Sequence, residues 1–169
     1  MDETEKSNFI TYCGVYCGSC GLRMTGVEED ERHLSHWAAR LDSAQKAYWT
    51  SCPGCRSGDH RADCDFRICA TAKGHEHCID CEAFPCKLHE EFDSDGVPHH
   101  AGSLASLELL KEVGPEAWLD RQREKWTCAC GARLSWYLSH CLKCGAPSAP
   151  CGAREGQQFG EIGRVSRKS

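Results

Sequence analysis

The sequence contains no long run of apolar residues. Its 169 residues include no window approaching the roughly 18 apolar residues that a membrane-spanning helix needs. The first ten residues, MDETEKSNFI, are acidic and polar, and they lack the apolar stretch of a secretory signal peptide. We therefore expect a cytoplasmic protein that makes no use of a membrane.

Apolar side chains are also scarce in the sequence as a whole. The hydrophobic fraction is 40%, but it counts 15 cysteines, and without them it is about 31%, which is low for a well-packed core. A structural zinc site supplies about 10–16 kcal/mol in small peptides, against about 5–15 kcal/mol for the stability of a whole domain. We therefore expect metal binding to decide whether this chain folds.

Motifs for catalysis are also missing. The sequence has no G-x-S-x-G, no phosphate-binding glycine loop and no H-E-x-x-H. Acidic pairs such as Glu90 and Glu91 are most simply explained as the solvated side of a helix. The sequence thus assigns no catalytic residue and leans away from an enzyme.

What the sequence does have is cysteine, 15 residues in all. In a short secreted chain this density would suggest disulfides, but a reducing compartment and an odd count favour metal thiolates. Several cysteines occur as C-x2-C pairs. Such a turn lets two sulfurs converge on one ion, and two turns complete a tetrahedral four-cysteine site.

The last third of the chain carries the strongest local metal pattern. Cys128, Cys130, Cys141 and Cys144 resemble the two knuckles of a zinc ribbon. The first knuckle departs from that pattern, because one residue separates its cysteines instead of two. Cys151 could therefore substitute for Cys128. We predict a zinc-ribbon-like β-hairpin module over residues 127–145 that binds one zinc ion.

Ten more cysteines occupy the first half of the chain. Cys17 and Cys20 could share one ion with Cys52 and Cys55, and five further cysteines could supply a second site, which leaves Cys13 and one other thiol over. Spacing alone does not establish which cysteines share an ion. All ten are candidate metal ligands: Cys13, Cys17, Cys20, Cys52, Cys55, Cys64, Cys69, Cys78, Cys81 and Cys86. Zinc is favoured, with [4Fe–4S] as the alternative in this half. Together with the C-terminal site, about three zinc ions are expected.

The stretch YCGVYCGSC has the C-x3-C-x2-C spacing of radical SAM enzymes. Those enzymes need a large barrel, commonly of about 200 or more residues, which this chain cannot hold. Ser19 also stands where they usually place an aromatic residue. Each histidine is more simply exposed or packed than a ligand, with His77 and His89 as reserve ligands for a site of three cysteines and one histidine.

These patterns predict a small metal-stabilised α-rich (α+β) domain with zinc-knuckle loops, followed by the ribbon-like module. The apolar spacing predicts a long helix at about 28–49, a short helix ended by Gly74 and another from about Pro85 or Cys86. It also predicts a helix over 103–113 that Gly114 stops, and a next helix that Pro115 can start and that runs to about Trp126. The expected units are a cysteine-rich domain (1–98), a helical hairpin (99–126), the module (127–145) and a flexible basic tail (146–169).

Charge is unevenly distributed along the chain. Residues 1–114 hold 11 basic and 20 acidic side chains, a net of −9, whereas residues 115–169 hold 9 and 5, a net of +4. Nucleic-acid binders present a basic face, so binding through the ribbon and tail is an unfavoured alternative. It would use Arg133, Lys143, Arg154, Arg164, Arg167 and Lys168.

An ordered series of motifs resembles a known family. YCGVYCGSC, CPGCRSG, CDFRICATAKGHEHCIDCEAFPC and KEVGPEAWL, followed by W-x-C, are similar to an uncharacterised cysteine-rich prokaryotic family, a domain of unknown function regarded as zinc-binding. The resemblance spans about Phe9 to Trp126 and matches all ten N-terminal cysteines. It implies metal binding by these thiols and no particular reaction, and the ribbon-like module is similar to that of longer members.

The sequence therefore favours a multi-zinc cytoplasmic protein that acts as a structural or interaction scaffold. An unidentified protein partner is compatible with this interpretation. The first alternative is an iron–sulfur redox or sensor protein, and the second is the nucleic-acid binder described above.

Overall fold

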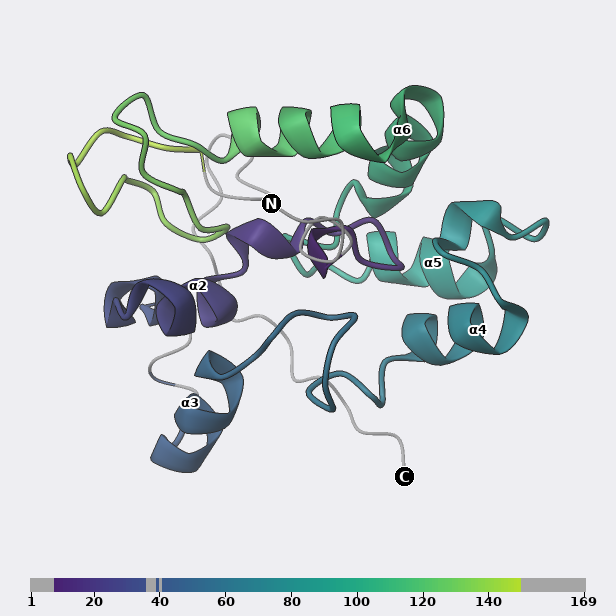
Figure 1. Cartoon of the computed structure of the whole chain (residues 1–169), viewed down its shortest axis with the longest axis horizontal. Coiled ribbons are helices and arrows are strands. Elements are labelled where there is room, and N and C mark those ends of the chain that lie inside the picture. Colours follow the sequence, from purple (N-terminus) through teal and green to yellow (C-terminus); the bar gives the residue numbers. More distant parts are fainter. Residues whose placement is uncertain (1–7, 36–38, 40, 150–169) are drawn as a thin grey trace.

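The computed structural model describes residues 8–35, 39 and 41–149, and this part of the chain is rich in helix (Figure 1). The longest helix, α6, lies along one side of the molecule in Figure 1, and the short helices and loops of the first half lie on the other side. The elements are η1 (Cys17–Ser19), α2 (Gly21–Glu28), η2 (Glu31–Leu34), α3 (Ser43–Thr50), α4 (Asp65–Lys73), η3 (Cys78–Asp80), α5 (Lys87–Asp93) and α6 (Ser103–Lys125). None of the helices in the described ranges is long and apolar enough to cross a membrane.

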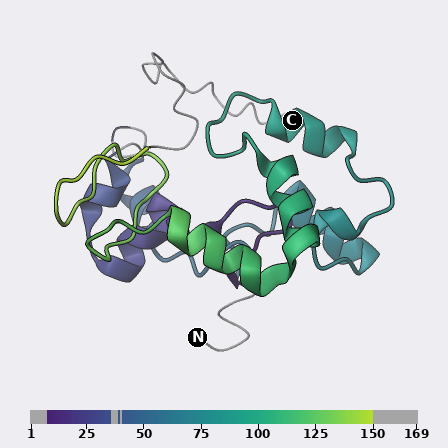
Figure 2. The same ribbon diagram turned by 90° about the horizontal axis from the view of Figure 1, so that it is seen from above.

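Helix α6 is broken in the middle, as the sequence predicts. Gly114 has φ 79° and ψ 166°, a conformation outside the helical region that glycine reaches without a steric penalty. Pro115 follows and begins the second part, a position where its missing N–H costs no hydrogen bond. Figure 2 shows the two parts meeting at a sharp angle. Along its length α6 contacts η3 and α5.

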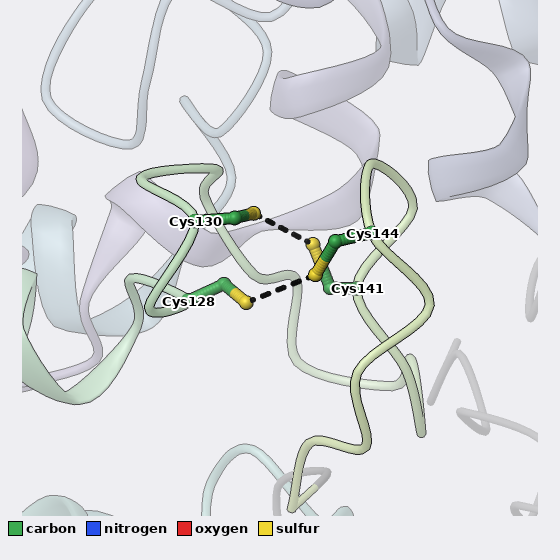
Figure 3. Close-up of side chains that lie close together, drawn as sticks. All are labelled: Cys128, Cys130, Cys141 and Cys144. Carbon is green, nitrogen blue, oxygen red and sulfur yellow. Dashed lines mark hydrogen bonds between the residues drawn. The ribbon is translucent and has the colours of Figure 1, made fainter.

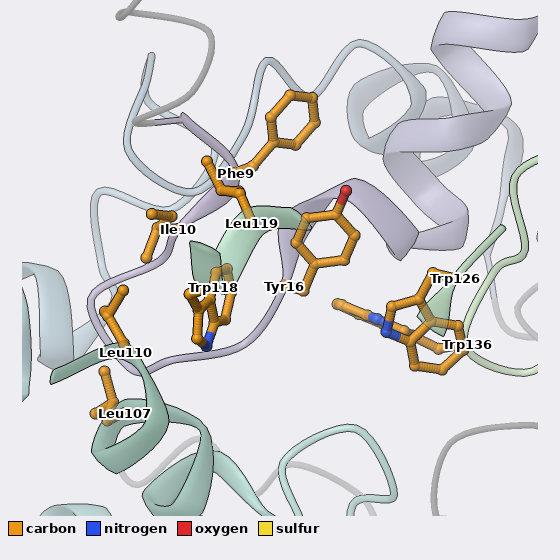
Figure 4. Close-up of a cluster of buried hydrophobic side chains, with 9 residues drawn as sticks. All are labelled: Phe9, Ile10, Tyr16, Leu107, Leu110, Trp118, Leu119, Trp126 and Trp136. Carbon is orange, nitrogen blue, oxygen red and sulfur yellow. The ribbon is translucent and has the colours of Figure 1, made fainter. Parts of the chain in front are cut away.

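The hydrophobic core lies between α6 and the first motif of the chain. Trp118 is fully buried, and its Nε1–H donates a 3.0 Å hydrogen bond to the Ser106 carbonyl, which ties the two parts of α6 together. Figure 4 shows the cluster running from the leucines of α6 to two tryptophans at its other end. Its members are Phe9, Ile10, Tyr16, Leu107, Leu110, Trp118, Leu119, Trp126 and Trp136.

The long helix predicted at about 28–49 is wrong. Glu29 adopts a left-handed conformation (φ 53°) and ends α2, and Asp30 then caps η2 by accepting the Arg32 N–H at 3.0 Å. Asp42 forms a capping box with Gln45 and begins α3. Both aspartates use their side chains to satisfy helix N-termini, a role that aspartate prefers to the helix interior. Residues 36–38, which include two apolar positions of the predicted helix, lie outside the described residues.

The predicted zinc-ribbon β-hairpin is also not formed. Between residues 127 and 149 the β-pairing consists of two isolated bridges, Thr127 with Arg133 and His140 with Pro147. Each cysteine loop closes on itself instead, for example through the 2.8 Å hydrogen bond from the Cys128 N–H to the Ala132 carbonyl. The described part of the chain therefore contains no strands. Most of the predicted basic tail, residues 150–169, lies outside the described residues.

Helices α4 and α5 form a small pair held by aromatic rings. Gly74 ends α4 with φ 70°, and Cys86 is the N-cap residue of α5, both close to the predicted positions. Phe66 of α4 packs against His89 and Phe92 of α5, with ring centroids 5.0 and 4.8 Å apart.

Candidate metal centre

Two short loops after α6 bring four cysteines together (Figure 3). The first loop carries Cys128 and Cys130, and the second carries Cys141 and Cys144. In the first loop the Gly131 N–H donates to the Cys128 carbonyl at 2.8 Å, and in the second the Gly145 N–H donates to the Cys141 carbonyl at 2.9 Å. These tight turns point the sulfurs of each loop toward the other loop.

The spacing of the four sulfurs suits a single tetrahedral ion. The Sγ atoms of Cys128 and Cys144 are 3.6 Å apart, as are those of Cys130 and Cys141. All four sulfurs lie within 4.8 Å of one another. A tetrahedral ion with Zn–S bonds of about 2.3 Å places its sulfurs about 3.8 Å apart. The donor set therefore fits a metal ion, and the prediction that Cys128 belongs to it agrees with the geometry. Cys151 lies outside the described residues.

The protein environment favours thiolate at one corner of this group. Backbone N–H groups of Cys144 and Lys143 lower the pKa of Cys141 to about 6. The pKa of Cys144 is also lowered by a backbone N–H, that of Ala146, but the thiols of Cys130 and Cys128 outweigh it and raise this pKa to about 12. The surroundings thus favour the thiolate at Cys141 and the neutral thiol at Cys144.

The module is attached to the first half of the chain through its second cysteine loop and through the segment between the two loops. The Trp136 N–H, between the loops, donates to the Ser19 carbonyl of η1 at 3.0 Å. Arg32 donates from Nη1 to the Leu142 carbonyl, inside the second cysteine loop, at 3.1 Å. Asp30 holds that guanidinium with contacts of 2.9 and 2.7 Å. The metal centre is therefore seated on η1 and η2.

A buried histidine forms the other connection. His33 of η2 has its side chain 2% exposed and lies 3.0 Å from Glu28 through Nε2 and 3.3 Å from Ser135 through Nδ1. The second carboxylate oxygen of Glu28 accepts a hydrogen bond from Arg133 Nε at 2.8 Å. Glu28 thus binds one side chain from each half of the chain. Ser135 is itself buried, so this arrangement is a structural joint and not an accessible serine site.

The N-terminal thiols lie near one another but are less tightly grouped. Interaction with the Cys17 thiol raises the pKa of Cys55 well above its ordinary value, and burial adds to it. Burial raises the pKa of Cys20 to about 11, with further contributions from Cys55 and Cys52. These four are the set that the sequence proposes as one site. Within the described ranges, however, the C-terminal four alone converge to within 4.8 Å, so N-terminal metal binding stays a prediction.

The ten N-terminal cysteines differ in exposure. Cys17 is buried and Cys69 is exposed. The other eight are half-buried: Cys13, Cys20, Cys52, Cys55, Cys64, Cys78, Cys81 and Cys86. All are free thiols, as expected for metal ligands.

The two histidines predicted as reserve ligands have different surroundings. His77 donates its backbone N–H to Asp80, and its Nδ1 lies 3.9 Å from the same carboxylate. His89 is fully buried between the rings of Phe66 and Phe84, and neither ring nitrogen makes a hydrogen bond. Burial lowers the pKa of His89, although the nearby Cys13 backbone opposes this.

Sequence reasoning misses the residues that seat the metal centre. Arg32 and Leu142 are 110 positions apart, and His33 and Ser135 are 102 positions apart. No spacing rule connects such distant residues. Ser135 and Arg133 lie between the two cysteine loops in the sequence, but this position does not indicate which residues they contact.

Comparison with known families adds one result. Residues 9–91 match the family described as "Protein of unknown function (DUF3795)". The predicted resemblance to a cysteine-rich family of unknown function is thereby confirmed, over a shorter range than the motif series indicates. The DUF3795 match includes all ten N-terminal cysteines and ends before α6, so the four-cysteine centre lies outside it. No curated protein and no solved structure matches the chain.

Proposed function

We propose that Cys128, Cys130, Cys141 and Cys144 bind one zinc ion, and that the protein is a multi-zinc structural or interaction scaffold with about three zinc ions per chain. The observation that carries the proposal is the convergence of four sulfurs within 4.8 Å, with two cross-loop distances of 3.6 Å.

These distances favour a single ion over an iron–sulfur cluster at this centre. In a four-iron cluster each cysteine binds a different iron, so the cysteine sulfurs stand much farther apart than the edge of one tetrahedron. Four thiolates and a tetrahedral geometry suit zinc. The pKa of Cys141, lowered to about 6, supports binding near neutral pH because this thiolate is already formed.

A zinc ion held by four thiolates is redox-inert and has no open coordination position, so it supplies structure and not catalysis. Hydrogen bonds from other residues then hold the module in place. The two loops, once held together, present the Leu142 carbonyl to Arg32 and the Ser135 hydroxyl to His33. The resulting function is to fix the module against η1 and η2 as one rigid surface for a partner.

The nucleic-acid alternative loses one of its six basic residues in this arrangement. Arg133 donates to Glu28 at 2.8 Å, and its side chain is only 36% exposed. Arg154, Arg164, Arg167 and Lys168 lie outside the described residues. We therefore propose a protein, and not a nucleic acid, as the partner.

The test is metal analysis of protein purified in reducing buffer without added zinc. We expect about three zinc per chain, and about one fewer in Cys141→Ser, because three thiols hold zinc much less tightly than four. Cys151→Ser is the matched control and should keep the full zinc content. Cobalt substitution should give the absorption of a tetrahedral thiolate site that Cys141→Ser lacks.

Equal zinc content in the wild type and Cys141→Ser would overturn the assignment of the centre. Iron with a brown colour in place of zinc would replace the zinc scaffold by the iron–sulfur alternative. Binding of the intact protein to DNA or RNA that weakens with salt would instead support the nucleic-acid alternative.

A further inference from the structure

The four sulfurs of the C-terminal centre form two pairs, each of which joins the two cysteine loops. Cys128 of the first loop contacts Cys144 of the second at 3.6 Å between sulfurs, and Cys130 contacts Cys141 at the same distance. Figure 3 shows both contacts crossing from one loop to the other. The sulfurs of a disulfide are about 2.05 Å apart, so a movement of about 1.5 Å within each pair brings its sulfurs to bonding distance.

The two pairs differ in their access to solvent. Cys144 is exposed and Cys128 half-buried, whereas in the other pair Cys141 is buried and Cys130 half-buried. Cysteines are oxidised readily when they are thiolates, reach solvent and have a second thiol beside them that can resolve the product. All four are thiolates when a metal ion is bound, so exposure decides which of them an oxidant reaches first. That sulfur is Cys144, and its resolving partner is Cys128.

We propose that hydrogen peroxide converts these four thiolates into two loop-crossing disulfides, Cys128–Cys144 first and Cys130–Cys141 second, and that the zinc ion leaves as they form. The centre is then a redox-sensitive zinc site. This inference deepens the proposed function and rests on it, because it takes the same four thiolates as zinc ligands. It is independent of the family match, which ends at residue 91 and does not include the centre.

Each disulfide consumes one molecule of hydrogen peroxide. The Cys144 sulfur attacks one peroxide oxygen, so that an S–O bond forms, the O–O bond breaks and hydroxide leaves, which makes Cys144 a sulfenic acid. The Cys128 thiolate then attacks the Cys144 sulfur, the S–S bond forms, the S–O bond breaks and a second hydroxide leaves. Two protons from solvent convert the hydroxides to water. The two sulfurs together lose two electrons, which the peroxide gains.

The first disulfide makes the second pair available to the same reaction. Only Cys130 and Cys141 then remain as ligands, and two thiolates hold zinc far less tightly than four. The ion therefore leaves, and a second molecule of peroxide oxidises this pair by the same two steps. Because Cys141 is buried, we expect the second disulfide to form more slowly than the first.

Pairing across the loops keeps the turns that form the module. The Gly131 N–H donates to the Cys128 carbonyl at 2.8 Å, and the Gly145 N–H donates to the Cys141 carbonyl at 2.9 Å. Both hydrogen bonds lie within a single loop, so a bond between sulfurs of different loops leaves them in place. The two disulfides join the same two loops that the ion joins. We therefore expect a dithiol reductant to restore zinc binding.

Trypsin separates the cysteines of this centre, so peptide mapping reads their pairing directly. Cleavage after lysine and arginine gives peptide 126–133 with both cysteines of the first loop, peptide 134–143 with Cys141, and peptide 144–154 with Cys144. Cys151→Ser removes the other cysteine of the last peptide. This variant is loaded with zinc, treated with hydrogen peroxide, alkylated and digested without reduction.

We expect a link between peptides 126–133 and 144–154 to appear first, through Cys128, and a link from Cys130 to peptide 134–143 to follow. About one equivalent of zinc should be released with these links, beyond what Cys141→Ser releases under the same treatment. A disulfide within either loop would overturn the inference. So would oxidation of Cys144 to a sulfinic acid without any disulfide.

Cys128→Ser and Cys130→Ser form a matched pair, because each removes one thiol from the same loop. With zinc in excess, both are treated with hydrogen peroxide and the sulfenic-acid probe dimedone. Labelling of Cys144 should be several-fold higher in Cys128→Ser, which lacks the resolving thiol, than in Cys130→Ser, which keeps it. Equal labelling would refute the assignment of Cys128 as the partner of Cys144.

Zinc content before oxidation separates this inference from the proposed function. If the wild type and Cys141→Ser hold equal zinc before peroxide is added, the zinc site is absent and both proposals fail. If the wild type holds the extra zinc but forms disulfides within the loops, or keeps all four thiols after peroxide treatment, the zinc site stands and this inference alone fails.

Discussion

The guanidinium of Arg32 donates a 3.1 Å hydrogen bond to the carbonyl oxygen of Leu142, 110 positions later in the chain. Leu142 lies inside a cysteine loop, directly after Cys141, while Arg32 belongs to η2 in the family-matched segment. This bond joins the four-cysteine centre to a part of the protein that contributes no sulfur to it. Loss of the bond should therefore loosen the module without removing a metal ligand.

Arg32→Ala should weaken the attachment of the module. The variant loses the Leu142 bond and the Asp30 pair, but the Arg32 side chain is 64% exposed, so we expect only a small loss in the free energy of unfolding. Zinc release to a chelator should become faster, because the second loop is less firmly held. Urea unfolding of the zinc-loaded protein gives the first quantity. Arg121→Ala, another exposed arginine, should change neither.

Glu28→Gln should lower the free energy of unfolding more than Glu29→Gln, the same substitution at the next residue. Glu28 contacts Arg133 at 2.8 Å and the buried His33 at 3.0 Å, and removing its charge weakens both contacts, which costs about 1–3 kcal/mol. Glu29 is exposed, so its variant should stay within about 0.5 kcal/mol of the wild type. Equal unfolding free energies for the two variants would show that Glu28 does not connect the two halves of the chain.

Gly14→Ala and Gly96→Ala form a matched pair, because both glycines have φ 82°. Both variants incur the left-handed penalty of about 1–2 kcal/mol. A Cβ at Gly14 would also stand 2.7 Å from Leu107 Cγ and 2.9 Å from the Ser103 carbonyl, whereas Gly96 has open space. We expect Gly14→Ala to lose about 1–3 kcal/mol more than Gly96→Ala in chemical unfolding. Equal losses would mean that α6 does not press on the first motif.

Stability should fall as the pH drops below about 6.5, in part through His100. Burial lowers the pKa of His100, although its hydrogen bond to Asp95 opposes the shift. The stabilising contribution is fully present above the unfolded pKa of about 6.5 and is lost as the pH falls through the lower folded value, because the unfolded chain then binds more protons. Between pH 7.5 and 5.5, unfolding free energy should fall more in the wild type than in His100→Gln. Parallel pH curves would contradict this.

Chelation of the bound metals should unfold most of the chain. The buried apolar cluster is small, so we expect metal–sulfur bonds to supply much of the stability. Far-ultraviolet circular dichroism should lose most of its helical signal, and returning zinc should restore it. A metal-free sample that kept its helical signal and melted cooperatively would show that packing alone suffices.

Local patterns in the sequence were enough to predict several of these features. Gly74 and Gly114 end helices where glycine and the following residues indicate it. The grouping of the four C-terminal cysteines was predictable because Cys128 and Cys144 are only 16 positions apart, so the short loops leave few alternative partners. The N-terminal sets remained open because their cysteines are numerous and separated by helices.

Other features depended on choices that local patterns do not reveal. Asp30 and Asp42 are as compatible with a solvated helix surface as with N-caps, and the structure uses them as caps. The spacing of the C-terminal cysteines suggested hairpins, yet tight turns position the sulfurs without a β-ladder. His33 and Ser135 meet only because the segments before and after α6 pack against each other.

The closeness of the four C-terminal ligands along the chain also bears on the order of folding. Bringing Cys128 to Cys144 closes a short loop, which costs little entropy and is fast, whereas joining His33 to Ser135 waits on contacts 102 positions apart. The cysteine module can therefore capture its ion as an early, self-contained nucleus and dock afterwards. Stopped-flow mixing with zinc should then show the thiolate–metal signal rising before the tryptophan fluorescence reaches its native value.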